Sequence, residues 1–173
     1  MWPQIEDEDK GHDEGDLEAL VGTENAMISA SVLLSQPQGT HRQFVATTGS
    51  GHHLIIDDAA GNTGPKPIEL VAVALAGCTA FDVINILRKK RQDVTGYEVK
   101  VEAEQTPDPP QVFTRIRIHH IVSGVDIAEN ALQDAIHLSE SKYCSVGAMV
   151  KLSAEIETTY EIVPAERLVA VNA

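Results

Sequence analysis

The chain has 173 residues, the length of one domain or of one domain with a tail, and 43% of them are hydrophobic, which is enough for a buried core. Its formal net charge of -13 argues against DNA, RNA and anionic membranes as partners. No run approaches the roughly 18 apolar residues of a membrane helix. No secretory signal is visible either, so we expect a cytoplasmic protein without a membrane partner.

Residues 1–24 are predicted to form an acidic, disordered arm. The first 20 contain eight acidic side chains and one lysine, with too few apolar side chains to offset the entropy of ordering. A short docked helix around residues 16–21 is the alternative. The folded domain is then expected to span residues 25–163, and residues 164–173 to form a C-terminal tail.

Three β-permissive runs follow the arm, at residues 26–34, 42–48 and 52–57. The second and third are separated by Gly49-Ser50-Gly51, which is typical of a tight turn between antiparallel strands. We therefore predict an antiparallel meander. The glycine and proline residues of the stretch 61–67 indicate a loop after it.

The clearest predicted element is a long helix over residues 67–92. Pro67 suits the first helical turn, and Glu69 lies near the positive end of the helix dipole. Residues 70–87 are nearly all apolar or small, so we expect the helix to be buried on most of its sides. A second copy of the chain is the simplest cover for a helix of this kind.

The next two runs, residues 96–104 and 112–122, alternate between apolar and polar residues with a period of two. They predict a hairpin with a long, proline-rich turn. Asp126 is then expected to cap a second helix, over about residues 127–142, whose apolar positions recur at helical spacing.

A final strand is predicted at residues 151–163, after a short helix or turn that carries Cys144. The complete order is βββ–α–ββ–α–β. Because alternating βα units are absent, this order indicates an α+β fold rather than a parallel, doubly wound sheet.

The two cysteines, Cys78 and Cys144, are the main candidates for chemistry. Without an export signal we expect a reducing compartment, where a catalytic or free thiol is more common than a structural disulfide. Cys78 lies in the long helix directly after Gly77, which leaves room for a ligand or another backbone to approach. The alternative is a buried, inert thiol that packs as a small hydrophobic group.

Asp82 follows Cys78 by four residues and therefore lies on the same helical face. A carboxylate there needs a hydrogen-bonding partner, so Asp82 either anchors the structure or shapes the thiol pocket. No metal site is predicted, because two distant cysteines are a poor zinc site. The pairs His52-His53 and His119-His120 can each direct only one ring inward from a strand.

Three segments carry a resemblance to a known family: PIELVAVALAGCTAFDVINILRKKRQ, PQVFTRIRIHHIVSG and LSESKYCSVGAMV. They resemble the osmotically inducible protein C / organic hydroperoxide resistance (OsmC/Ohr) family over about residues 42–163. Gly77-Cys78-Thr79 and Asp82 are similar to the GC[ST]xxD segment of an OsmC-like branch. The resemblance implies an intertwined homodimer, in which strands of one protomer join the sheet of the other and the two long helices pack together.

The resemblance also implies a thiol-dependent hydroperoxide reductase without a cofactor. Cys78 would attack an organic hydroperoxide, Cys144 would resolve the product as a disulfide, and an external dithiol would reduce the pair. In the best-known members an arginine of the N-terminal strands and a glutamate at the start of the central helix lower the pKa of the attacking thiol. Ile68 stands at the glutamate position here, which leaves the neighbouring Glu69 and Arg42, the only arginine before the helix, as candidates.

Two other functions remain open at this point. Because Ile68 replaces the expected acid, the dimer could be non-enzymatic, and either hold a small hydrophobic molecule between its apolar helices or sense the redox state. A structural dimer with inert thiols is the third hypothesis. It predicts that both thiols resist alkylation in the folded protein.

Overall fold

A computed structural model of the chain describes residues 27–35 and 38–165. The predicted arm over residues 1–24 and most of the predicted tail lie outside these described residues. The elements, in chain order, are β1 (Ala30–Leu34), β2 (Phe44–Thr48), β3 (His53–Ile56), α1 (Pro67–Lys89), β4 (Asp93–Gln105), β5 (Phe113–Val125), α2 (Glu129–Leu138), a π-helical turn η3 (Ser139–Tyr143), α3 (Ser145–Val150) and β6 (Glu155–Pro164). They form the predicted α+β fold.

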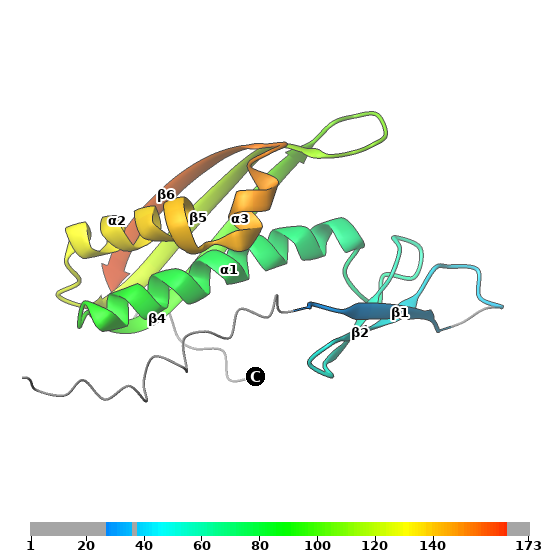
Figure 1. Cartoon of the computed structure of the whole chain (residues 1–173), viewed down its shortest axis with the longest axis horizontal. Coiled ribbons are helices and arrows are strands. Elements are labelled where there is room, and N and C mark those ends of the chain that lie inside the picture. The colour runs from blue at the N-terminus through cyan, green and yellow to red at the C-terminus, as the bar shows by residue number, and fades with distance from the viewer. Residues whose placement is uncertain (1–26, 36–37, 166–173) are drawn as a thin grey trace, which may run out of the picture.

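The N-terminal sheet is the predicted antiparallel meander, in the order β1-β2-β3. The turn between β2 and β3 depends on Gly51, whose φ of 85° is a left-handed conformation that favours glycine. All of β1 is exposed, and its Leu33 side chain is 74% accessible. In Figure 1 this sheet lies at one end of the molecule, beyond the start of α1. The apolar side chains of β1 are therefore not covered by the residues that the structure describes.

The second sheet has the order β4-β5-β6. The predicted hairpin is confirmed, since β4 and β5 pair in antiparallel register, with Val99 opposite His120. β6 pairs with β5 in parallel, which the strand pattern by itself did not indicate. A parallel neighbour needs a crossover connection, and α2, η3 and α3 together supply it. Figure 1 shows these helices and α1 beside the second sheet.

The long helix α1 begins at Pro67 as predicted but ends at Lys89, three residues early. Arg91 adopts a left-handed backbone with φ 56°, and the chain turns there toward β4. At the other end, the Glu69 carboxylate accepts the backbone N–H of Lys66 at 2.8 Å. Glu69 therefore satisfies one of the free N–H groups at the start of the helix.

Within one chain α1 buries a single stripe. Leu75, Thr79, Val83 and Leu87 follow one another at four-residue spacing and are buried. Other apolar side chains of α1 remain in solvent, and Phe81 is 73% exposed. The expectation that the helix is buried on most sides is thus not met inside one protomer, because the sheet and α2 cover only one face.

Among the described residues, one helix, α1, is long enough and apolar enough to cross a membrane, judged by length and composition only. The expectation that no stretch approaches such a composition is therefore wrong for this helix, in which Glu69 and Asp82 are the only charges before Arg88. The core helix of a soluble protein passes the same test. In this fold one face of α1 packs against the second sheet and α2.

The second helix also departs from its prediction. Its N-cap is Ala128 and not Asp126, because β5 continues to Val125 and Asp126 turns the chain with φ 50°. The side chain of Gln92 accepts the N–H of Ala128 at 2.8 Å, so a residue distant in sequence assists this helix end. After Leu138 the α-helix widens into the π-helical turn η3, which leads to Cys144.

Two hydrophobic clusters form between the second sheet and the helices. One joins α1, α2 and β5 and contains the fully buried Leu87, Val122 and Leu132. The other joins α1, α3 and β5 and contains Leu75, Ile116 and Cys144. Both clusters include residues of α1, and Cys78 packs against the second of them.

Candidate functional site

The fold brings the two cysteines together although 66 residues separate them in sequence. The sulfur atoms of Cys78 and Cys144 and a carboxylate oxygen of Asp82 all lie within 4.8 Å of one another. Cys78 and Asp82 come from successive turns of α1, and Cys144 comes from the junction of η3 and α3. These three side chains form the candidate site, which we call the dithiol site.

The π-helical turn determines where Cys144 lies. The N–H of Cys144 donates to the carbonyl of Ser139, five residues earlier, at 2.8 Å. Such turns insert one extra residue into a helix and are frequent at functional sites. Here the turn ends the crossover helix so that Cys144 becomes the N-cap of α3.

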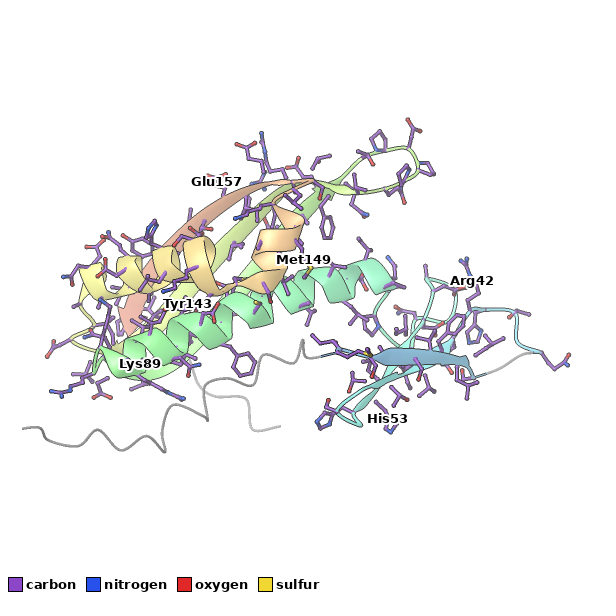
Figure 2. The ribbon with its side chains drawn as sticks, in the orientation of Figure 1. Arg42, His53, Lys89, Tyr143, Met149 and Glu157 are labelled. Atoms are coloured by element: carbon purple, nitrogen blue, oxygen red, sulfur yellow. The ribbon has the colours of Figure 1, made fainter. Side chains whose placement is uncertain are left out.

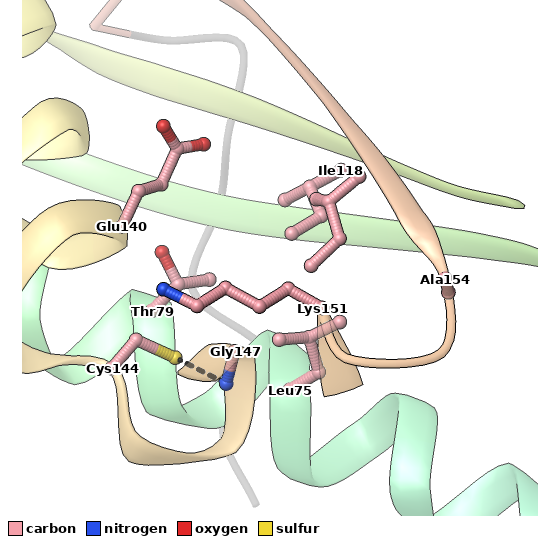
Figure 3. Close-up of a pocket in the computed structure, with 9 residues that line it drawn as sticks. Leu75, Thr79, Ile118, Glu140, Cys144, Gly147, Lys151 and Ala154 are labelled. Carbon is pink, nitrogen blue, oxygen red and sulfur yellow. Dashed lines mark hydrogen bonds between the residues drawn. The ribbon is translucent and has the colours of Figure 1, made fainter. Parts of the chain in front are cut away.

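The Cys144 sulfur then accepts the N–H of Gly147 at 3.2 Å, as a capping side chain does at a helix start (Figure 3). A Cβ atom on Gly147 would lie only 3.2 Å from this sulfur, which is a crowded contact. Glycine therefore fits here because the backbone passes close to the thiol.

Asp82 has the partner that a partly buried carboxylate requires. The Ser139 hydroxyl donates to Asp82 Oδ2 at 3.0 Å and lies 3.2 Å from the Thr79 hydroxyl. Ser139 is fully buried. It therefore ties η3 to α1 through its side chain while its carbonyl holds the Cys144 backbone.

The two thiols have different environments. Cys144 is buried, and this burial raises the pKa of its thiol to about 11, with the neighbouring Cys78 adding to the effect. At neutral pH Cys144 is thus a protonated thiol. Cys78 is partly exposed, and its sulfur lies 3.9 Å from the Ser145 hydroxyl.

A pocket of about 380 Å³ opens beside the site. Its apolar wall is formed by side chains of α1, β5 and β6, and the Cys144 thiol lies in it (Figure 3). The Lys151 side chain extends across the opening toward Thr79, and Glu140 lies on the far side. The lining residues are Leu75, Thr79, Ile118, Glu140, Cys144, Gly147, Lys151, Ala154 and Ile156.

Arg42 does not reach the dithiol site of its own chain. Its guanidinium Nε lies 3.1 Å from Asp58 Oδ2, and its side chain is otherwise exposed. The Arg42 backbone N–H and guanidinium together hold the pKa of the Asp58 carboxyl at about 2. Figure 2 places Arg42 beside the N-terminal sheet, away from Tyr143, the neighbour of Cys144.

Glu69 also lies apart from the thiols, at the first turn of α1, with a carboxylate oxygen 3.7 Å from the Lys66 amine. Ile68, which stands where the resemblance predicted an acid, is partly buried against the cluster that contains Leu75. Of the five residues proposed from the sequence, the fold thus brings Cys78, Cys144 and Asp82 together. Arg42 and Glu69 remain elsewhere in the chain.

Several residues of the site were missed by sequence reasoning. Ser139 binds Asp82, Gly147 donates to the Cys144 sulfur, and Lys151 extends over the pocket toward Thr79, all through backbone turns that the residue pattern does not encode. One available signal was the density of hydroxyl side chains around Cys144, at Ser139, Ser141 and Ser145. Such a group near a thiol is typical of a polar site rather than of a packed core.

A buried polar pair lies in the sheet that supports α1. The Tyr97 hydroxyl and His120 Nδ1 are 2.6 Å apart, and burial and the Asp82 charge raise the pKa of Tyr97. Burial lowers the pKa of His120 to about 4, and His119 adds to this effect. His120 is fully buried whereas the His119 side chain is 38% exposed, which confirms that only one ring of this pair points inward.

The chain is similar to known proteins in sequence. The family model of OsmC-like protein matches residues 60–159. Protein YhfA of Escherichia coli strain K12 is 42% identical over 122 residues, which are 70% of this chain and 91% of YhfA.

Solved structures give a consistent result. A hypothetical protein from Aquifex aeolicus VF5 superposes with a TM-score of 0.70 and 30% identity, over 80% of this chain and 97% of that one. The organic hydroperoxide resistance protein OhrB of Bacillus subtilis superposes with a TM-score of 0.54, over 78% of this chain and 98% of OhrB. At 16% identity, the likeness to OhrB concerns the fold alone.

Proposed function

The chain belongs to the OsmC-like protein family, and on this premise we propose that it is a thiol-dependent hydroperoxide reductase. The observation that carries the proposal is the convergence of the Cys78 and Cys144 sulfur atoms, within 4.8 Å, beside a pocket with an apolar wall. Two thiols at this separation need only a modest movement to form a disulfide. Among the fold relatives are proteins described by their resistance to organic hydroperoxides.

In the proposed reaction Cys78 is the attacking residue, because it is the more exposed of the two thiols. Its thiolate attacks one oxygen of the peroxide R–O–O–H and breaks the O–O bond. Cys78 becomes a sulfenic acid, and the leaving alkoxide takes up a proton to give the alcohol R–OH. This step transfers two electrons from the sulfur to the peroxide.

Cys144 then completes the cycle. Its sulfur attacks the sulfenic sulfur of Cys78, a disulfide forms, and the hydroxyl leaves as water. An external dithiol reduces the disulfide by thiol–disulfide exchange and restores both thiols. The apolar wall of the pocket suits the organic part of a hydroperoxide, and a cytoplasmic, reducing compartment suits the cycle.

The proposal is tested by the stoichiometry of a single turnover. When the fully reduced protein receives one equivalent of cumene hydroperoxide, we expect two free thiols to be lost per peroxide consumed. Intact-mass measurement should detect the loss of two hydrogen atoms, as in an intramolecular disulfide. Unchanged thiols after the peroxide is added would contradict the proposed function, and one added oxygen without a disulfide would contradict the role of Cys144.

We also propose that two copies of the chain form a homodimer. Phe81 on α1 and Leu33 on β1 are 73% and 74% exposed in one protomer, and a Cβ on Gly77 would meet open space. Exposed apolar surface of this kind is typical of an interface between protein chains. The open space at Gly77 would allow a second helix to pack closely against α1. A partner of this kind could also bring Arg42 or Glu69 toward the thiols.

Replacing Phe81 with glutamate is expected to weaken this dimer by about 100-fold or more, because the variant places a charge where a large aromatic side chain would be buried. Sedimentation velocity across a dilution series measures the change. A matched control is Val112→Glu, which adds the same charge at an apolar position near the tip of the β4–β5 hairpin. Equal dimerisation of both variants and the wild type would contradict an interface at Phe81.

The pocket supports a second candidate function. A cavity of about 380 Å³ with Leu75, Ile118 and Ile156 in its wall is suited to a small apolar molecule held without turnover. Native mass spectrometry of the freshly purified protein separates the two functions. A co-purifying small molecule together with no peroxide consumption would favour binding, whereas turnover without such a molecule favours the reductase.

A further inference from the structure

We propose that the reduced dithiol site, with Asp82 as its third ligand, binds a thiophilic divalent cation such as Zn²⁺. Cys78, Cys144 and Asp82 would be the protein ligands, and water would occupy a fourth position. Two thiolates and a carboxylate are a ligand set that zinc accepts, and three protein ligands with one open position are known for zinc sites. The binding itself does not depend on the proposed peroxide chemistry.

The distances between the three ligand atoms fit this proposal. In a tetrahedral site with Zn–S near 2.3 Å and Zn–O near 2.1 Å, neighbouring ligand atoms are about 3.6–3.8 Å apart. The two sulfurs and the Asp82 oxygen already lie within 4.8 Å of one another. Closure on a cation therefore requires each pair to approach by about 1.2 Å at most. A disulfide needs the sulfurs to come to about 2.05 Å, which is a longer approach.

The surroundings of the ligands also resemble an organised metal site, in which neighbouring groups orient the ligands through hydrogen bonds. The Ser139 hydroxyl donates to Asp82 at 3.0 Å, and the Gly147 N–H donates to the Cys144 sulfur at 3.2 Å. Both donors remain compatible with ionised ligands, because each donates a hydrogen bond to a ligand side chain. Asp82 also lines a surface pocket with Lys89 and Tyr143, which supplies a path from solvent.

The ligand side chains themselves favour a cation, while Lys89 and Lys90 line the surface pocket next to Asp82. Among the ion pairs of the described residues, none involves Asp82, whose hydrogen-bonding partner is the neutral Ser139. With both thiols ionised, three negative charges would converge within 4.8 Å, and a divalent cation removes that repulsion directly. Lys151 extends over the neighbouring pocket but is exposed, so its side chain can turn toward solvent.

One consequence rests on the proposed function: the cation and the peroxide compete for the same two thiols. Oxidation of the loaded site by R–O–O–H, with two protons, gives the disulfide, R–OH, water and the free cation. The two thiolates supply both electrons. The cation therefore slows turnover, and oxidation of the dithiol releases the cation.

The experiment uses Co²⁺ as a spectroscopic probe for the reduced full chain, under anaerobic conditions and without peroxide. We expect one equivalent of Co²⁺ to produce the thiolate-to-cobalt charge-transfer absorption of a tetrahedral site, and Zn²⁺ to displace it. Asp82→Asn should weaken Co²⁺ binding by about tenfold or more, and Ser139→Ala by about tenfold through loss of the group that orients Asp82. The matched control is Asp134→Asn, which removes an exposed carboxylate on α2 that pairs with Lys90.

Absence of the charge-transfer absorption, or equal affinity of Asp82→Asn, Asp134→Asn and the wild type, would overturn the cation site. Circular dichroism identifies any variant that fails to fold, and in that event Ser139→Ala decides the question. Peroxide turnover in the presence of a chelator is measured separately. A protein that binds Co²⁺ as described but consumes no peroxide would disprove the proposed function and support the cation site. A protein that consumes peroxide but does not bind Co²⁺ would support the proposed function and disprove the cation site.

Discussion

Replacement of Cys78 by serine is expected to reduce hydroperoxide consumption to the uncatalysed background, a loss of about 10³-fold or more. A serine hydroxyl is a poor nucleophile without an activating base, and it does not form a sulfenic acid. The reaction is followed as loss of cumene hydroperoxide in the presence of excess dithiothreitol. Circular dichroism should confirm that the variant folds, since serine adds no bulk and Cys78 is partly exposed.

Cys144→Ser separates the attacking thiol from the resolving thiol. This variant should still consume one equivalent of peroxide, because Cys78 is intact, and should accumulate a sulfenic acid that dimedone traps. The opposite pattern, in which Cys78→Ser retains the first turnover and Cys144→Ser loses it, would reverse the two roles. Rapid consumption by both variants would rule out this pair of thiols as the source of activity.

The second large expected effect is a loss of folding stability at acid pH, which we attribute to His120. His120 is fully buried, and burial lowers its pKa to about 4, compared with about 6.5 in an unfolded chain. Between these values the unfolded state binds a proton that the folded state does not, so a fall in pH favours unfolding. The stability that the folded state has while His120 is neutral in both states is fully present above pH 6.5. It is lost progressively as the pH falls through 4. It amounts to about 3 kcal/mol of unfolding free energy.

The measurement is urea unfolding between pH 7 and pH 3.5 for the wild type, His120→Gln and His119→Gln. The glutamine at position 120 keeps a hydrogen-bonding group near Tyr97 but does not titrate. Its unfolding free energy should therefore fall less on acidification than that of the wild type. His119→Gln keeps the buried imidazole but removes the neighbour that adds to the lowering of its pKa, so its slope should lie between those of the wild type and His120→Gln. Identical slopes for all three proteins would show that His120 is not the group responsible.

Protonation of His120 is expected to affect the dithiol site, because His120 lies in the sheet against which α1 packs. His120 pairs with Tyr97, and the Asp82 charge contributes to the raised pKa of Tyr97. A proton on His120 therefore introduces a positive charge into the layer behind α1, which carries Cys78 and Asp82. We expect loss of folding and loss of site geometry to occur together at low pH.

The amino-acid sequence alone determined most of the elements of this fold. Period-two alternation located β4 and β5, and the glycine-rich turn located the hairpin of β2 and β3. Pro67 located the start of α1, because proline lacks the N–H that the first helical turn does not need. These features depend on local chemistry, which neighbouring residues encode.

The sequence also placed Cys78 and Asp82 on one helical face, since residues four apart lie on successive turns. It did not predict the early end of α1 at Lys89 or the cap of α2 at Ala128. Both boundaries depend on left-handed turns at Arg91 and Asp126. Neither residue type requires such a conformation, so local preference could not reveal them.

The approach of Cys144 to Cys78 was decided by the tertiary structure. It depends on the parallel placement of β6 beside β5, on the π-helical turn η3, and on the buried hydrogen bond from Ser139 to Asp82. Arg42 illustrates the same limit, because its pairing with Asp58 follows from the packing of a loop against a strand end. Contacts between segments far apart in sequence follow from the packing of a common core, and no local pattern records them.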